Sequence, residues 1–237
     1  MSEFKDKVII ITGAAGNLGE AVAQRFAQDG AKIALVDIDE EGMAETASRL
    51  PAETTCISIK TNLFEPESVA AMADAVKQQF GNCDYLANIA GGFAMGSKLY
   101  EASDREWQMM MGLNAQSVFH SSRVTIPQMI ETGAGRIVSI SARAAREGKA
   151  TMGPYCASKA AVITLTESMA AEHKMDNINV NCILPGTIDT PENRSAMPDA
   201  DFDNWVPPAA LADVVAFLCS DAARCVTGAA VPVYGKS

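Results

Sequence analysis

The sequence lacks the long apolar runs and the excess of positive charge that would indicate a membrane or a nucleic acid as a partner. No uninterrupted apolar stretch approaches the ~18 residues that suggest a transmembrane helix. The 237 residues include 19 lysines and arginines against 29 aspartates and glutamates, so the formal net charge is −10. A field of that sign repels phosphate backbones and anionic headgroups. The composition therefore predicts neither a nucleic-acid partner nor a membrane partner.

Metal ligands are also scarce. The two histidines, His120 and His173, do not lie beside a cysteine or carboxylate cluster at ligand spacing, so we expect no metal site. No two cysteines have CxxC spacing, and most of the six are predicted to be small buried hydrophobic residues: Cys56, Cys83, Cys156, Cys182, Cys219 and Cys225.

The N-terminus has no features of a secretory leader. Residues Met1–Lys7 are polar and charged, and they lead into a strand-like run without an apolar stretch or a small-residue cleavage site. We therefore expect a cytoplasmic protein. Hydrophobic residues make up 48% of the chain, which excludes a disordered protein, and 237 residues suit one large domain. Residues 1–237 are predicted to form that single domain.

Short apolar β-type runs alternate with longer segments of helical period along the whole chain. This alternation is typical of a parallel sheet covered by helices on both faces. About seven strands are predicted, at Lys7–Thr12, Lys32–Asp37, Thr54–Ile59, Asp84–Asn88, Gly135–Ser141, Asn177–Leu184 and Ala229–Tyr234. Helices are predicted at Leu18–Asp29, Glu40–Arg49, Pro66–Phe80, Asp104–Glu131, Tyr155–Lys174 and Pro208–Ser220. The fold class is therefore α/β, a Rossmann-like doubly wound parallel sheet.

Residues 186–207 form the one long stretch without clear periodicity. Long loops of this kind in compact α/β domains are most often lids or binding loops, and ligands bind beyond the carboxyl ends of parallel strands. Because this loop follows the sixth predicted strand at such an end, we expect it to be a substrate lid.

A glycine-rich turn lies between the first strand and the first helix. Residues 12–19 read TGAAGNLG, and glycines at a strand-to-helix turn let the backbone approach a pyrophosphate at a helix N-terminus. Asp37 ends the second strand, where a carboxylate can accept hydrogen bonds from adenosine ribose hydroxyls and repel a 2′-phosphate. No lysine or arginine follows within the next four residues. These features predict NAD(H) in preference to NADP(H), unless Asp37 merely caps the next helix.

Tyr155 and Lys159 are spaced i and i+4, which places a phenol and an ammonium on one face of a helix. A protonated amine near a phenol favours the phenolate, so we expect Lys159 to lower the pKa of Tyr155 toward working pH. A tyrosine that acts as general acid and base during hydride transfer needs such a pKa.

Together these motifs resemble the classical short-chain dehydrogenases/reductases, whose first turn reads TGxxxGxG. Asn17 stands where that pattern has its middle glycine. Because asparagine adopts a left-handed backbone more readily than other non-glycine residues, we expect the turn to be retained.

The resemblance implies a set of cofactor contacts along most of the chain. Besides Asp37, Tyr155 and Lys159, the implied cofactor-binding residues are Gly13, Gly16, Asn17, Leu18, Gly19, Asn62, Leu63, Asn88, Ala90, Gly91, Pro185, Gly186, Ile188 and Thr190. It also implies that Asn114 anchors a water-linked proton path to Lys159, although a buried structural asparagine is the alternative. A homo-oligomer, a tetramer or a dimer, is implied as well.

The catalytic serine of the family is missing. It stands thirteen residues before the tyrosine, which here is Ala142. Its neighbour Ser141 points to the opposite face of a strand unless a bulge re-aims it. Loss of such a donor costs a few kcal/mol of transition-state stabilisation for a ketone. Either another donor replaces the hydroxyl, or the substrate does not need it, or the protein is not a competent enzyme.

The loop strings DTPENR and MPDADFDNW, together with the turn GGFA at 91–94, resemble the quinonoid dihydropteridine reductases, which also carry alanine at this position. A quinonoid dihydropterin takes hydride into a conjugated imine system and so forms no alkoxide. An apolar slot for a flat ring would be lined by Phe93, Met95, Met152, Met197, Phe202 and Trp205, beside Ala142, unless these side chains only pack.

These observations predict an NAD(H)-dependent oxidoreductase that transfers hydride between nicotinamide and a small carbonyl, alcohol or imine-type substrate. Two alternatives stay open. One is a quinonoid dihydropteridine reductase proper, and the other is an NAD(H)-binding sensor or scaffold without turnover. The presence of both Tyr155 and Lys159 argues against the second.

Overall fold

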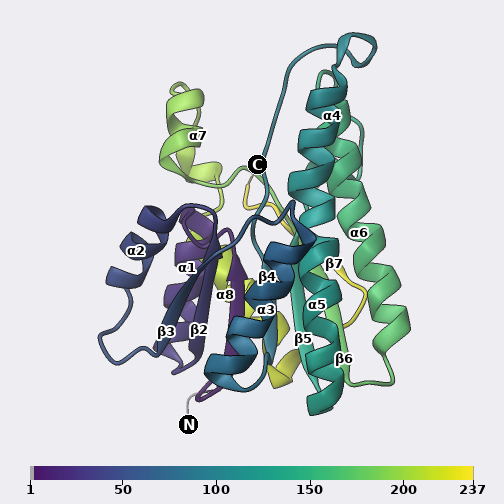
Figure 1. Ribbon diagram of the computed structural model, residues 1–237. Coiled ribbons are helices and arrows are strands. Elements are labelled where there is room, and N and C mark those ends of the chain that lie inside the picture. Colours follow the sequence, from purple (N-terminus) through teal and green to yellow (C-terminus); the bar gives the residue numbers. More distant parts are fainter. Residues whose placement is uncertain (1–2, 237) are drawn as a thin grey trace.

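One parallel sheet organises the structure, a computed structural model that describes residues 3–236 (Figure 1). Its seven strands pair in the order β3-β2-β1-β4-β5-β6-β7, so the Rossmann-like α/β fold predicted from the sequence is confirmed. The strands are β1 (Val8–Thr12), β2 (Lys32–Asp37), β3 (Cys56–Lys60), β4 (Tyr85–Asn88), β5 (Gly135–Ile140), β6 (Ile178–Pro185) and β7 (Ala230–Val233).

Helices cover both faces of this sheet. They are α1 (Asn17–Gln28), α2 (Glu40–Ser48), α3 (Pro66–Phe80), α4 (Asp104–Met110), α5 (Ser117–Thr132), α6 (Gly153–His173), α7 (Pro191–Ala196) and α8 (Pro208–Cys219). Side chains alternate along β1, because successive residues of a strand point to opposite faces. Ile9 and Ile11 pack into one core with α1 and α8, whereas Val8 and Ile10 pack into the other with α3 and α5.

All the predicted strands, and every predicted helix but one, lie within two residues of an observed element at both ends. The predicted helix Asp104–Glu131, however, is not regular. It consists of α4, a π-helical turn η2 (Met111–Gln116) and α5. Hydrophobic periodicity predicts helix through a π-turn, because the apolar pattern keeps its helical period on each side and only its phase changes.

The predicted lid also contains more structure than expected. Residues 186–207 include the short helix α7, which stands apart from the sheet above α1 and α2 in Figure 1, and a 3₁₀ turn η4 (Phe202–Asn204). Thr190 caps α7 by accepting a hydrogen bond from the Asn193 amide at 3.3 Å, and Pro191 opens the helix. A capping residue followed by proline is a readable helix start, so this part of the loop was predictable.

Within the described part of the chain, no helix is long and apolar enough to cross a membrane. Across residues 3–236, no group of three or more histidine, cysteine or acidic side chains is arranged to hold a metal ion. Four of the six cysteines are buried, as the sequence predicts.

Candidate active site

A pocket of about 790 Å³ opens at the carboxyl ends of the central strands. It lies where the chain leaves β1 toward one side and β4 toward the other, which is where open α/β sheets bind ligands. Its walls come from the glycine-rich turn, the segments after β4, β5 and β6, the start of α6, and the lid. Segments far apart in the sequence therefore meet at one site.

The glycine-rich turn needs its glycines for backbone packing. Gly13 has φ +69°, and a Cβ there would lie 2.7 Å from the backbone of Ala90. A Cβ on Gly19 would lie 2.2 Å from the carbonyl oxygen of Gly13. The expectation of a left-handed Asn17 is wrong, because Asn17 is the first residue of α1 and Gly13 supplies the left-handed conformation. The turn itself is retained.

Asp37 lies on the wall of the pocket with its carboxylate fixed by backbone amides. It accepts hydrogen bonds from the Ala15 amide at 3.1 Å and from the Ile38 amide at 2.7 Å. The alternative in which Asp37 caps the next helix is wrong, because Asp39 caps α2 by accepting from the Gly42 amide at 3.1 Å. The Asp37 carboxylate thus joins the glycine-rich turn to the end of β2.

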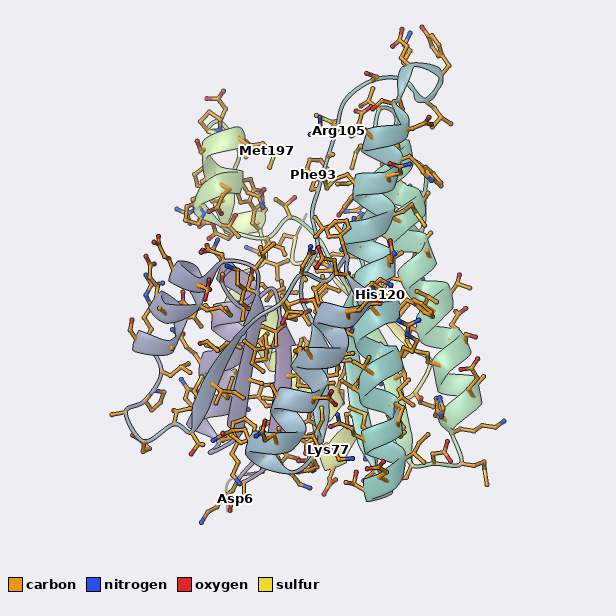
Figure 2. The ribbon with its side chains drawn as sticks, in the orientation of Figure 1. Asp6, Lys77, Phe93, Arg105, His120 and Met197 are labelled. Carbon is orange, nitrogen blue, oxygen red and sulfur yellow. The ribbon has the colours of Figure 1, made fainter. Side chains whose placement is uncertain are left out.

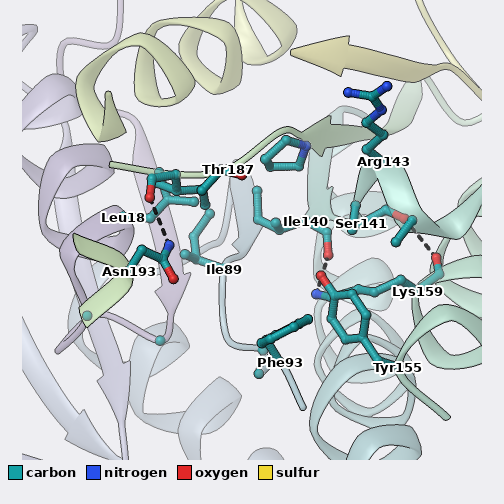
Figure 3. A pocket seen from close by; sticks show the side chains of 18 of the residues that line it. Leu18, Ile89, Phe93, Ile140, Ser141, Arg143, Tyr155, Lys159, Thr187 and Asn193 are labelled. Carbon is teal, nitrogen blue, oxygen red and sulfur yellow. Dashed lines mark hydrogen bonds between the residues drawn. The ribbon is translucent and has the colours of Figure 1, made fainter. Parts of the chain in front are cut away.

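Tyr155 and Lys159 both lie in the pocket wall on the first turns of α6 (Figure 3). The ammonium of Lys159, only 4% exposed, donates to the carbonyl oxygen of Ile140 at 2.9 Å. Burial lowers the pKa of Lys159 from 10.5 to about 8. Burial also raises the pKa of Tyr155 to about 12, and the neighbouring Cys156 adds to the rise. The expectation that Lys159 lowers the pKa of Tyr155 is therefore not met here, since desolvation of the phenol dominates.

Asn114 lies in the π-turn and is 1% exposed. Its side chain accepts a hydrogen bond from the Gly92 amide at 2.9 Å and donates to the Gly92 carbonyl at 3.1 Å. It also donates to the Ser158 hydroxyl at 2.9 Å. Asn114 therefore ties the segment after β4 to α6 from a position behind the pocket wall.

Ala142, thirteen residues before Tyr155, lines the pocket. The hydroxyl of the adjacent Ser141 donates to the backbone carbonyl of Lys159 at 2.7 Å and is buried. The structure therefore commits the Ser141 hydroxyl to α6 rather than to a substrate, as the alternation of strand side chains predicts.

The structure brings most of the predicted residues to the pocket, but not all of them. Lining residues among those predicted are Gly13, Gly16, Leu18, Gly19, Asp37, Ala90, Gly91, Phe93, Ala142, Met152, Tyr155, Lys159, Pro185, Gly186, Ile188 and Met197. The predicted residues outside its lining are Asn17, Asn62, Leu63, Asn88, Met95, Asn114, Thr190, Phe202 and Trp205.

Local contacts explain several of these positions. Asn88 is buried between the hydroxyls of Ser139 and Ser121, at 3.1 and 2.6 Å. Phe202 packs against the buried Trp205, with ring centroids 4.8 Å apart. Asn17 instead reaches the lid, where its side-chain amide donates to the Glu192 carboxylate at 3.0 Å. The structure thus places Phe202 and Trp205 in the packing of the lid and not in the wall of a ring slot.

Some lining residues carried no sequence signal. Among them, Leu113 and Asn193 enter the wall from the π-turn and the lid. Asn193 donates to the Ile188 carbonyl at 2.8 Å, which holds the start of the lid (Figure 3). Figure 2 shows Met197 and Phe93 on opposite sides of the pocket mouth. Only the tertiary path of the chain puts these side chains together.

The residues present fit a dinucleotide. The N-cap of α1, Gly16, has no side-chain cap, so the first amides of this helix are available to an anion. The close packing at Gly13 and Gly19 brings bare backbone to the same place. Asp37 lines the pocket from the end of β2, and Tyr155 and Lys159 line it from α6. The pocket therefore offers an anion site, a carboxylate for a ribose and an acid/base pair.

Comparisons with known proteins agree with this geometry. A sequence profile described as "short chain dehydrogenase" matches residues 7–201. The chain is 32% identical to meso-2,3-butanediol dehydrogenase of Serratia marcescens over 241 residues, covering 98% of this chain and 94% of that protein. It is also 32% identical to an NAD-dependent glycerol dehydrogenase of Listeria innocua over 232 residues, covering 94% and 90%.

Solved structures resemble the whole fold. An NAD⁺-bound xylitol dehydrogenase superposes with a TM-score of 0.92 at 28% identity, covering 98% of this chain and 99% of that one. Carveol dehydrogenase from Mycobacterium avium in complex with NAD gives a TM-score of 0.92 at 28% identity, with 99% and 98% covered.

Proposed function

The chain belongs to the short-chain dehydrogenase/reductase family and is an oxidoreductase of it, and from this premise we propose an NAD(H)-dependent enzyme that interconverts a small alcohol and its carbonyl compound. The observation that carries the proposal is the joint placement of Tyr155 and Lys159 in the wall of a pocket that begins at a glycine-rich turn. Membership of a family of dehydrogenases does not support the alternative of a sensor or scaffold without turnover.

The preference for NAD(H) over NADP(H) rests on Asp37. Its carboxylate faces the pocket next to the glycine-rich turn, where it would accept hydrogen bonds from ribose hydroxyls and repel a 2′-phosphate. The cationic side chains in the pocket lining, Arg143, Lys149 and Lys159, come from the segment after β5 and from α6. None of them comes from the turn after β2 that holds Asp37, so nothing there offsets the repulsion.

When bound, the nicotinamide would supply or accept the hydride. Tyr155 holds its proton at neutral pH because its pKa is about 12, so in the direction of reduction it donates that proton to the carbonyl oxygen of the substrate. Lys159, with a pKa of about 8, is able to exchange a proton near neutral pH and lies on the same face of α6. Asn114 holds the Gly92 peptide and Ser158 around this pair and so fixes the wall that orients Tyr155.

Ala142 supports a second candidate, a quinonoid dihydropteridine reductase. Here the pocket presents a methyl group where a serine hydroxyl would polarise a ketone oxygen. An imine-type acceptor develops no alkoxide and does not need that donor. Phe93 and Met197, which lie on opposite sides of the mouth, supply apolar surface for a flat ring.

We also propose a homo-oligomer, a dimer or a tetramer, acting on a small molecule. Large apolar side chains remain exposed on α4 and α5, since Trp107, Phe119 and Ile130 are 47%, 45% and 46% exposed. Exposed apolar side chains that gather into a patch are typical of an interface. Residues 186–207 are proposed as the lid over the substrate.

The test is a turnover assay on purified protein. NAD⁺ is mixed with meso-2,3-butanediol, glycerol or xylitol, and NADH with diacetyl or chemically generated quinonoid dihydropterin, while NADH absorbance is followed. Turnover should fall by roughly 10²–10⁴-fold in Tyr155→Phe, with NADH affinity unchanged. Full activity in that variant would overturn the mechanism.

The variant Ala142→Ser separates the two candidates. For a carbonyl substrate the restored hydroxyl should raise the turnover number several-fold, because it adds a donor to a developing alkoxide. For a dihydropterin substrate it should leave turnover unchanged or lower it. A protein that binds NADH but neither oxidises nor reduces any compound of the panel would contradict both candidates.

A further inference from the structure

The phenol of Tyr155 is in contact with one aromatic side chain of the pocket mouth, Phe93. The two ring centroids are 5.0 Å apart and the ring planes meet at 84°, an edge-to-face arrangement (Figure 3). This is the favoured geometry of an aromatic pair, because the positive edge of one ring faces the negative face of the other. Phe93 comes from the segment after β4 and Tyr155 from α6, so the contact joins two separate elements.

The segment that carries Phe93 is held close to the catalytic groups by two glycines. A Cβ on Gly91 would lie 2.9 Å from both the Asn114 side-chain oxygen and the Lys159 nitrogen. A Cβ on Gly92 would lie 2.6 Å from Leu113. Residues without a side chain therefore let the backbone pass directly over Asn114 and Lys159, which delivers Phe93 to the phenol.

The hydrogen bonds of Asn114 close a ring of contacts around Tyr155. Asn114 holds both the amide and the carbonyl of Gly92, at 2.9 and 3.1 Å, and donates to the Ser158 hydroxyl at 2.9 Å. Ser158 in turn donates to the Tyr155 carbonyl at 2.8 Å. The backbone of Tyr155 and the backbone beside Phe93 are thus fixed to the same side chain. The contact between the Phe93 and Tyr155 rings is a second link between the same two segments.

Phe93 remains 60% exposed although it is fixed in this way. An apolar ring left open to solvent contributes little to folding, because most of its surface is not buried. Its contact with Tyr155 and its position in the pocket lining are therefore better explained by the site than by the core.

We infer that Phe93 is a positioning residue, whose ring holds the phenol of Tyr155 at the angle needed to pass its proton to the substrate oxygen. The inference rests on the proposed function and adds a residue to it. Without the ring, the side chain of Tyr155 gains freedom about its χ angles on the open side of the pocket. Misplacing a proton donor by about 1 Å can cost on the order of 100-fold in rate, so a partial loss of orientation should cost on the order of tenfold.

The first experiment is a double-mutant cycle on the compound of the turnover panel that the wild-type protein converts fastest. Phe93→Ala should lower kcat about tenfold, with a smaller change in KM and unchanged NADH affinity. Phe93→Tyr should restore most of the loss, because it keeps the ring. In a Tyr155→Phe background, Phe93→Ala should have almost no further effect on kcat, because the group it orients is gone.

Met95→Ala is the matched control. Met95 lies on the same segment and is 65% exposed, but it is not part of the pocket lining. Its replacement should leave kcat unchanged. An equal fall in kcat in Phe93→Ala and Met95→Ala would show a merely structural role and overturn the inference. So would a fall in kcat caused by Phe93→Ala in the Tyr155→Phe background that is as large as the fall it causes in the wild-type protein.

A second measurement does not depend on turnover. Ring-labelled tyrosine gives an NMR signal for Tyr155, assigned by its absence in Tyr155→Phe. Removal of the Phe93 ring should move that signal by the lost ring current, whereas Met95→Ala should not. An unmoved signal in Phe93→Ala would overturn the inference. A wild-type protein that binds NADH but converts nothing, with the signal moved, would contradict the proposed function alone.

Discussion

Replacing Lys159 by methionine should inactivate the enzyme and stabilise its fold at neutral pH. The ammonium of Lys159 is 4% exposed, and burial lowers its pKa from 10.5 to about 8. That fall corresponds to roughly 3 kcal/mol spent on keeping the charge in the folded protein at neutral pH. Methionine has a similar length and carries no charge, so the variant avoids this cost.

The gain is partly offset by a lost hydrogen bond. Lys159 donates to the Ile140 carbonyl at 2.9 Å, and a buried carbonyl without its partner costs about 1–3 kcal/mol. The net expectation is a rise of about 1 kcal/mol in the free energy of unfolding. In a chain of 237 residues this raises Tm by about 2–4 °C.

The pH dependence identifies the cause. Between a pKa of about 8 in the folded state and 10.5 in the unfolded state, the unfolded protein binds more protons at this lysine. The stability of the wild-type protein therefore rises with pH across this window relative to the variant. The advantage of Lys159→Met is complete below pH 8 and is lost as the pH approaches 10.5.

The assay is urea unfolding followed by tryptophan fluorescence at neutral pH and again near pH 10.5. Tyr155→Phe serves as the control, because it also removes activity but leaves Lys159 in place. A stability difference between wild type and Lys159→Met that stays constant over this pH range would refute the desolvation argument. Retained turnover in Lys159→Met would refute its place in the acid/base pair.

Three further changes probe the cofactor end of the pocket. Gly19→Ala should lower NADH affinity and should lower the free energy of unfolding by about 1–3 kcal/mol, because its Cβ would lie 2.2 Å from the Gly13 carbonyl oxygen. Gly148→Ala, with open space around it, should change neither quantity in the same NADH titration and thermal melt. Asp37→Ser should weaken NADH roughly ten- to 100-fold and strengthen NADPH, as measured by calorimetry; equal effects on both cofactors would remove the ribose role. Asn17→Gly should speed NADH release a few-fold in stopped-flow fluorescence by freeing Glu192, whereas Glu192→Gln, which keeps an acceptor, should not.

The sequence predicts the sheet and most helices because their hydrophobic period is set by burial along each element. Val8–Thr12 is apolar at its first four positions, and the structure buries all five residues between two helical layers. The same reasoning predicts Tyr155 and Lys159 as neighbours, since four residues make about one helical turn.

Sequence reasoning fails where the answer depends on three-dimensional surroundings. The spacing of Tyr155 and Lys159 shows a charge partner but not the burial that raises the pKa of the phenol. The aromatic residues Phe202 and Trp205 suggest a ring slot, yet the fold of the lid packs them on each other. Asn17 suggests a left-handed turn, but Gly13 supplies that conformation, so Asn17 begins the helix and reaches the lid instead.

The π-helical turn at Met111–Gln116 has a geometric consequence for the long helical arm formed by α4 and α5. One extra residue in a turn offsets the angular phase of everything after it by roughly 100° from that of a regular helix. Trp107 of α4 and Phe119 of α5 would lie roughly 120° apart around a regular helix, so this offset brings them toward the same side. Deletion of a single residue in this turn would straighten the arm into a regular helix. It would also turn Asn114 away from Gly92 and rotate the exposed apolar side chains of α5 relative to those of α4. The contact of Asn114 behind the pocket and the apolar outer face of the arm therefore depend on the same turn.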